Sequence, residues 1–124
     1  MRTNLALFAI CFALTAVACS DSTGSSSTNL CDNSGAAATV SATDQYVYTP
    51  SSVTITVGQS VCWQNTGKLD HTVSDGVRFN APLPSGQTFV HTFGFGGTFT
   101  IHCAIHDNMT GTVEVKCKPG DISC

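Results

Sequence analysis

A thiol, an imidazole and a thioether stand close together near the end of the sequence, at Cys103, His106 and Met109. Alternating apolar residues before Cys103 predict a strand, so the three side chains lie on a short loop at the exit of that strand. Such a loop can wrap one ion with all three groups. Soft sulfur with imidazole favours copper, and two histidines, one cysteine and a distant methionine form its electron-transfer site. The pattern therefore predicts a copper site that lacks only its second histidine.

His71 is the natural second histidine, because it opens a predicted strand directly after the polar loop 66–70. His91 lies in the middle of another predicted strand between two phenylalanines, so it should face the core. His102 precedes Cys103, and neighbours along a strand point to opposite faces. We therefore interpret His91 and His102 as structural or surface residues.

The cluster allows two other interpretations. Without a metal, Cys103 would be a buried thiol, His106 a surface residue and Met109 a core residue. A structural zinc site would use short-range pairs of cysteine and histidine ligands, and the sequence has no second such pair. The position of His71 at a strand start favours the copper site over both.

The elements that must position these residues are short strands. From Tyr46 onward the apolar residues alternate with a period of two, and no stretch offers a helix-length apolar stripe. Residues 53–57 and 61–63 should form a hairpin-like pair, whereas 75–86, with two prolines and two glycines, should be a long irregular connection. About seven to eight strands, each with one apolar face, predict an all-β antiparallel sandwich around one core.

The same residues carry a resemblance to a known family. The chain resembles the plastocyanin and amicyanin branch of the cupredoxins, the type I (blue) copper proteins, over the stretches 48–65, 70–73 and 97–113. The resemblance covers roughly residues 46–115. The two-residue gap between His106 and Met109 is similar to that of amicyanin, whereas plastocyanin has a longer loop.

This resemblance implies a Greek-key cupredoxin sandwich with one copper ion. It implies three ligands in a near-trigonal plane and a long axial methionine, which would be His71, Cys103, His106 and Met109. It also implies that Thr72 takes the place of a residue that hydrogen-bonds across to the cysteine loop and steadies the site. Ala104 stands where amicyanin has threonine, which removes one hydroxyl from this neighbourhood.

A site with four protein ligands has no open position of the kind that metal hydrolysis needs. We therefore expect an electron-transfer protein, not an enzyme, that shuttles single electrons between exported or membrane-bound redox partners. The alternative is a copper-binding module for delivery or storage. Such modules use several exposed Met and His residues, but after residue 18 this chain has one methionine, Met109. That scarcity favours electron transfer.

Partners are expected to meet the surface around His106, whose imidazole edge is exposed in cupredoxins. Ile105 and Leu83 should form a small apolar patch there, with an acidic rim from Asp70, Asp75 and Asp107, the last at a position that is proline in amicyanin. Such a rim would steer a cationic redox protein. The chain should be a monomer. Basic residues are too few for a nucleic-acid surface, since the chain has five Lys and Arg against eight Asp and Glu.

The N-terminus predicts export. Residues 1–18 read as a signal peptide, with an apolar stretch too short for a comfortable membrane span. Cys19 follows a lipobox-like end, although Ala16 replaces the usual leucine and an ordinary cleavage after Ala18 is the alternative. Residues 19–37 would then be a lipidated Cys19 and a flexible tether, and 38–124 a cupredoxin domain with a short cysteine-containing tail. The protein should sit on the periplasmic or cell-surface side of a membrane, anchored through the lipid.

Seven cysteines in so short a chain also point to an oxidising compartment. With Cys11 removed, Cys19 lipidated and Cys103 on copper, four cysteines remain, and these permit three pairings. We favour Cys31 with Cys62 and Cys117 with Cys124, although sequence alone does not determine the connectivity.

Overall fold

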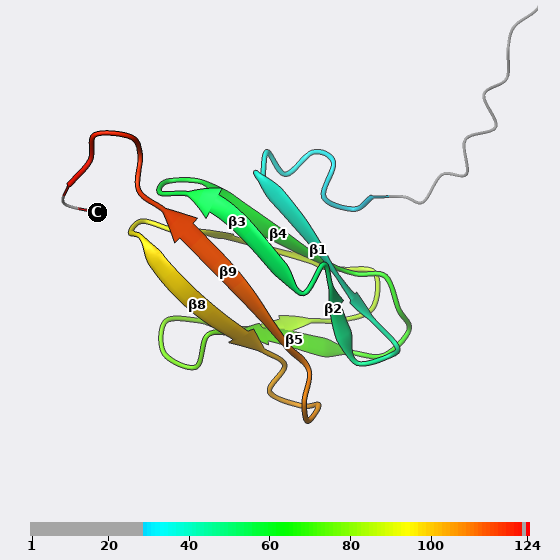
Figure 1. The fold of residues 1–124 in the computed structure, drawn as a ribbon. Helices are drawn as coiled ribbons and strands as arrows, with labels where there is room; N and C mark the ends of the chain where they lie inside the picture. The colour runs from blue at the N-terminus through cyan, green and yellow to red at the C-terminus, as the bar shows by residue number, and fades with distance from the viewer. Residues whose placement is uncertain (1–28, 123) are drawn as a thin grey trace, which may run out of the picture.

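The computed structural model describes residues 29–122 and 124. This part of the chain contains no helix and nine strands, which are β1 (Ala38–Thr43), β2 (Val47–Thr49), β3 (Ser52–Thr56), β4 (Ser60–Asn65), β5 (His71–Ser74), β6 (Asn80–Leu83), β7 (Thr88–Thr92), β8 (Gly97–His102) and β9 (Thr110–Lys116). They form one sheet in the order β2-β1-β4-β7 and a second in the order β3-β9-β8-β5-β6. The two sheets make a cupredoxin-like sandwich (Figure 1), so the predicted all-β class is confirmed.

The pairing of the strands differs from the prediction in two ways. Both sheets are mixed, because β1 runs parallel to β4 and β3 runs parallel to β9. The expected hairpin of β3 with β4 is wrong, since these strands belong to different sheets. A period of two identifies which face of a strand is buried, but it does not identify the neighbouring strand or its direction.

The connection expected to be irregular contains a strand. β6 lies within it and pairs antiparallel with β5, with Leu83 opposite His71. Pro82 is tolerated there because β6 is the edge of its sheet, where a missing backbone N–H costs no ladder bond. With β2, which is only three residues long, this brings the strand count to nine within the described residues.

The core joins the two sheets and extends to the predicted site. Trp63 is 1% exposed and packs against three phenylalanine rings at 5.9–6.5 Å, those of Phe79, Phe89 and Phe93. The same cluster of buried residues includes Cys103 and Met109. The loop that carries the predicted ligands is therefore attached at both ends to the packed core of the sandwich.

Two disulfides join Cys31 to Cys62 and Cys117 to Cys124, as favoured from the sequence. Among the described residues, Cys103 is the free cysteine. Cys31 and Cys62 are both buried, and the bond attaches the segment before β1 to β4. Within the described part of the chain, no helix is long and apolar enough to cross a membrane. The predicted signal peptide 1–18 and the lipid on Cys19 lie outside the described residues.

Candidate metal centre

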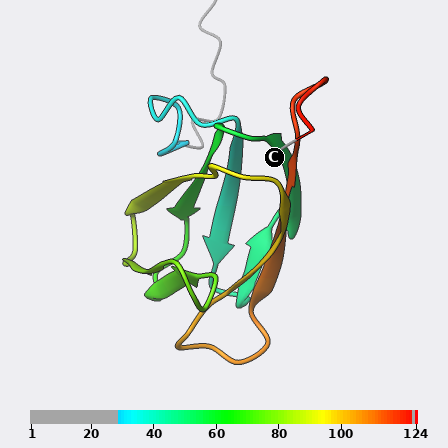
Figure 2. The ribbon, with the colours of Figure 1, turned by 90° about the vertical axis from the view of Figure 1, so that its left-hand side faces the viewer.

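The sheet that contains β5, β8 and β9 brings the predicted ligands to one end of the sandwich. β5 and β8 are antiparallel neighbours with Ser74 opposite His102, so His71 extends beyond the end of β8 towards the loop that follows. Cys103 begins that loop, and β9 resumes at Thr110. Figure 2 shows the β8–β9 loop at the end of the sandwich opposite the C-terminus.

Three donor atoms converge there, from His71, Cys103 and His106, all within 4.8 Å of one another. The Nδ1 atoms of the two histidines are 3.1 Å apart, and Sγ of Cys103 is 3.4 Å from Nδ1 of His106. His71 and Cys103 are buried, whereas His106 is half-buried. This group has the donors and the spacing to hold a metal ion, with one imidazole near the surface.

Met109 lies at the other end of the same loop. Its side chain is 1% exposed, and its carbonyl accepts a hydrogen bond of 3.0 Å from the backbone N–H of Cys103. Asn108, which precedes it, has a φ of 63°, a left-handed conformation that asparagine tolerates better than most residues. The loop thus turns back on itself and returns Met109 to the strand exit. Its axial role remains a prediction.

The protonation state of His71 suits a metal ligand. Burial, and after it the neighbouring His106, lower the pKa of His71 below its ordinary value, against the opposing charges of Asp44 and Asp70. A neutral imidazole with a free lone pair is the form that binds metal. Nε2 of His71 is buried and meets no hydrogen-bond partner among the described residues. With Nδ1 among the converging donor atoms, the group fits a soft metal held by two imidazoles and a thiolate.

Thr72 connects the two halves of the site, as the resemblance implied. Its backbone N–H lies 3.3 Å from Sγ of Cys103, and its hydroxyl lies 3.7 Å from the same sulfur. The hydroxyl also accepts a 2.6 Å hydrogen bond from the N–H of Ala104. Donors aimed at a thiolate stabilise its charged form and fix its direction.

The sequence did not reveal that Tyr48 supports Thr72. Tyr48 is 3% exposed, and its hydroxyl donates a 2.5 Å hydrogen bond to the carbonyl of Thr72. Burial, with a smaller effect of Cys103, raises the pKa of Tyr48 well above its usual range, so the hydroxyl stays a donor. Its position in an alternating strand marks it as a core residue, but nothing in that pattern points to Thr72.

Asn65 and Asp44 hold the loop before His71, and the sequence did not assign either of them a role. Asn65 is 1% exposed; its amide donates to the carbonyls of Leu69 and Leu83 at 2.7 and 2.9 Å. Its side-chain oxygen accepts from the N–H of Gly67 at 2.9 Å. Asp44 accepts from the N–H groups of residues 68 and 69 at 2.7 and 3.0 Å. An asparagine two residues before a glycine signals a turn, which was the one available hint.

The other two histidines stay outside the centre. His91 packs its ring 4.3 Å from Phe79 and 4.9 Å from Phe93, as expected of a residue that faces the core. His102 lines a separate hollow of about 380 Å³, beside Gly76 and Ala104. Neither joins the group of three converging donors.

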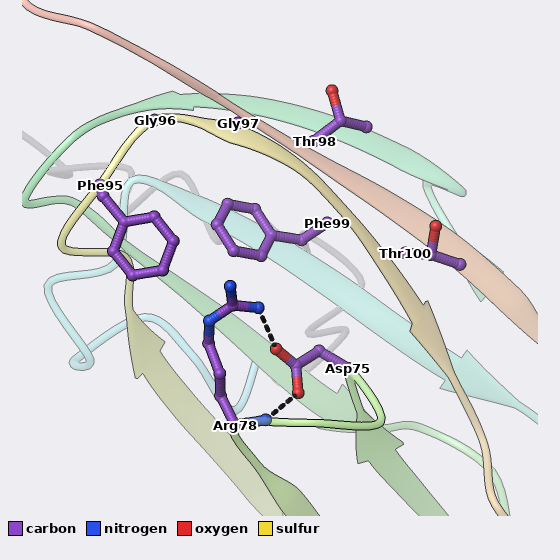
Figure 3. A pocket seen from close by; sticks show the side chains of 8 residues that line it. All are labelled: Asp75, Arg78, Phe95, Gly96, Gly97, Thr98, Phe99 and Thr100. Carbon is purple, nitrogen blue, oxygen red and sulfur yellow. Dashed lines mark hydrogen bonds and ion pairs between the residues drawn. The ribbon is translucent and has the colours of Figure 1, made fainter. Parts of the chain in front are cut away.

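A second hollow, of about 280 Å³, lies between the β5–β6 connection and β8 and contains none of the three donors (Figure 3). Arg78 crosses it, with its guanidinium 4.8 and 5.1 Å from the ring centroids of Phe95 and Phe99. The guanidinium also bonds Asp75 at 3.0 Å, and the Asp75 side chain is 2% exposed. We interpret this hollow as a structural arrangement in which an ion pair and two rings attach the β5–β6 connection to β8.

Two of the predictions for the surface around His106 are wrong. Leu83 is fully buried, because it faces the core opposite His71 on β6. Asp75 points inward to three backbone N–H groups and Arg78, so it adds no charge to the rim. Ile105 is 57% exposed, and Asp70 and Asp107 are exposed.

Comparisons with known proteins agree with this geometry. No family model and no curated protein matches the chain. Among solved structures, a novel purple cupredoxin from Nitrosopumilus maritimus matches with 28% identity and a TM-score of 0.59, covering 64% of this chain and 99% of that one. A reduced variant of amicyanin matches with 27% identity and a TM-score of 0.60, covering 66% and 83%. An oxidised amicyanin variant matches with 25% identity and a TM-score of 0.61, covering 68% and 85%.

The fold, the His-Cys-His group and these similarities define the class: the chain is a cupredoxin-like protein. Its likeness is to both purple cupredoxin and amicyanin structures.

Proposed function

We propose that this chain binds one copper ion through His71, Cys103, His106 and Met109 and transfers single electrons without itself being an enzyme. The observation that carries the proposal is the convergence of two imidazole nitrogens and one thiol sulfur within 4.8 Å at one end of a packed sandwich. Similarity to amicyanin structures, one of them described as a reduced Cu(I) form, supports copper as the metal. When bound, copper supplies one-electron exchange between Cu(I) and Cu(II).

The residues around the group favour fast exchange by holding the ligands still. His71 is the first residue of β5, which pairs with β8 on one side and with β6 on the other. Thr72 attaches β5 to Cys103. The cysteine and Met109 belong to the buried core. Ligands fixed in this way keep nearly the same positions in both oxidation states, so little reorganisation should accompany electron transfer.

Electrons would enter at His106. It is the half-buried member of the group, and exposed Ile105 precedes it. A small apolar surface suits the brief, small contacts of redox proteins, which bury less than ~1,200 Å² in total. Asp70 and Asp107 supply a weak acidic rim, which would speed encounters with cationic partners at low salt.

Reduction of the Cu(II)-loaded Ile105→Lys variant by a cationic one-electron reductant, hexaammineruthenium(II), which becomes Ru(III), tests this route by stopped flow. Val77→Lys is the matched control, since Val77 is 86% exposed on the β5–β6 connection and the charge change is the same. Ile105→Lys should react more slowly than Val77→Lys at low salt, and the difference should shrink at high salt because the added charge is screened, with unchanged visible spectra. Equal rates for the two variants would place the entry route elsewhere.

We further propose export with a lipid on Cys19, with residues 19–37 as tether and 38–124 as the folded domain. The two disulfides in the described part of the chain support an oxidising compartment. Cys19→Ala should move the protein from the membrane to the soluble fraction of its native host. A wild-type protein that is already soluble and unacylated would refute the anchor without affecting the copper proposal.

A further inference from the structure

The β1–β2 turn carries an unusual residue beside the candidate centre. Tyr46 has a φ of 60°, and its side chain is 47% exposed. Glycine, asparagine and aspartate enter this left-handed region readily, whereas a bulky aromatic residue there is an outlier. Such conformations persist where the surrounding structure fixes them, and they gather at functional sites.

The turn is fixed from several directions. Asp44 accepts hydrogen bonds from the N–H groups of Lys68 and Leu69, and it lies so close to Gly67 that a Cβ added there would clash with its carboxylate. The N–H of Tyr46 donates to the carbonyl of Thr43 at 3.0 Å. Two residues after Tyr46, the Tyr48 hydroxyl bonds Thr72. The turn is therefore tied to the loop before His71 and to the strand that His71 opens.

This arrangement brings the ring of Tyr46 into contact with the ring of His106. The Tyr46 ring centroid lies 4.7 Å from that of His106, with the planes inclined by 52°. His106 also meets the ring of His71, at 4.9 Å between centroids and 65° between planes. His106 comes from the β8–β9 loop, where it is half-buried. Because the His106 ring is only partly packed, its contacts with neighbouring rings are what hold it in one orientation.

We propose that Tyr46 is a positioning residue that fixes the orientation of the His106 imidazole and so aims Nδ1 at the metal. This inference rests on the proposed copper centre, and it assigns a role to a residue outside the ligand set. The aromatic ring is the acting part, since the ring makes the contact. A phenylalanine should therefore replace Tyr46, and a residue without a ring should not.

The test compares the wild type with Tyr46→Phe and Tyr46→Gly. Glycine is the decisive substitution because it removes the ring while favouring the backbone conformation of the turn, so damage to the turn does not explain its effect. The first readout is the metal-free protein, in which NMR couplings and NOEs report the orientations of the His106 ring. One orientation is expected in the wild type and Tyr46→Phe, and averaging over several in Tyr46→Gly. Thermal unfolding of all three confirms that each is folded.

The second readout is the copper-loaded protein. The relative intensities of the visible bands should change in Tyr46→Gly and stay at the wild-type values in Tyr46→Phe. The proposal is overturned if Tyr46→Gly retains either the single ring orientation or the wild-type bands. A wild type that develops no thiolate band would instead contradict the copper centre, and the metal-free measurement would still decide the role of Tyr46.

Discussion

Single residues at the centre are held in different ways, and this difference sets what each can do. His71 and Cys103 are buried and tied together through Thr72, whereas His106 is half-buried on a loop. The two buried donors are thus shielded from water, whereas the third donor lies partly at the surface. Met109, buried at the end of the loop, is the remaining donor of the proposed set.

Met109→Leu tests the axial assignment. The substitution keeps the volume of a core side chain but removes a thioether that stabilises Cu(II) more than Cu(I). We expect the colour to persist and the reduction potential to rise, by ~59 mV for each tenfold change in the relative affinities. Cyclic voltammetry of the copper-loaded protein measures the shift. An unchanged potential would mean that Met109 is not a ligand.

Asp75 illustrates a residue whose charge serves the fold. Burial acts to raise the pKa of Asp75, but the N–H groups of Val77, Arg78 and Phe79, and the Arg78 guanidinium, hold it well below its ordinary value. A depressed pKa means that the stabilisation is complete above the unfolded value of ~3.9 and is lost as pH falls towards the folded value.

Asp75→Asn should accordingly lower the free energy of unfolding at pH 7 by about 2 kcal/mol, the scale of hydrogen bonds to a charged group. The difference from wild type should shrink progressively as pH falls below ~4, because the carboxylate is then protonated in the unfolded state while the folded state keeps it ionised down to its lower pKa. Urea denaturation at several pH values measures it, with the exposed Asp32→Asn as control. A pH-independent difference would contradict the role of the charge.

Whole elements determine where the ligands meet. The antiparallel pairing of β5 with β8 carries His71 past the end of β8, and the β8–β9 ladder sets where the ligand loop starts and ends. Asn65, at the end of β4, joins the loop before His71 to the carbonyl of Leu83 on β6. The position of His71 therefore depends on hydrogen bonds made outside its own strand.

Asn65→Ala should remove three hydrogen bonds at a site that is 1% exposed. Because the partners are left unsatisfied, we expect a loss of about 3 kcal/mol in the free energy of unfolding. Copper affinity should fall as well, since His71 loses its support. Denaturation and copper titration measure both, with exposed Asn80→Ala as the matched control. A stable variant with weakened copper binding would still support the positioning role, whereas wild-type values for both would contradict it.

The sequence identified Cys103 and His106 because they stand three residues apart in one loop, and His71 because it opens a predicted strand after a polar loop. Thr72 followed from the resemblance. The sequence did not predict the edge strand β6, because Pro82 and Pro84 are typical of loops. It did not predict the two parallel strand pairs either, because an alternating pattern does not indicate the direction of the neighbouring strand. Tyr46 and Asn65 act through contacts between segments distant in sequence. Such contacts follow from the three-dimensional fold and leave no local pattern.

In the molecule as a whole, the candidate metal centre lies at one end of the sandwich and the disulfide-bonded C-terminal tail lies at the other. The Cys117–Cys124 bond packs over Gly96, in the turn before β8, whereas the ligand loop follows β8. The sandwich core is made largely of apolar side chains that pack between the two sheets. Loss of the metal should therefore leave the fold intact, which allows the centre to be tested by removing a ligand.

The most direct measurement is a titration of the metal-free protein with Cu(II), followed by visible absorption, for the wild type and Cys103→Ala. The wild type should develop an intense thiolate-to-Cu(II) band that saturates at one copper per chain, and the variant should develop none while far-UV circular dichroism shows the same β-sandwich. A wild type without this band, or a Cys103→Ala variant that retains it, would contradict the assignment of Cys103 as the copper ligand and with it the proposed electron-transfer centre.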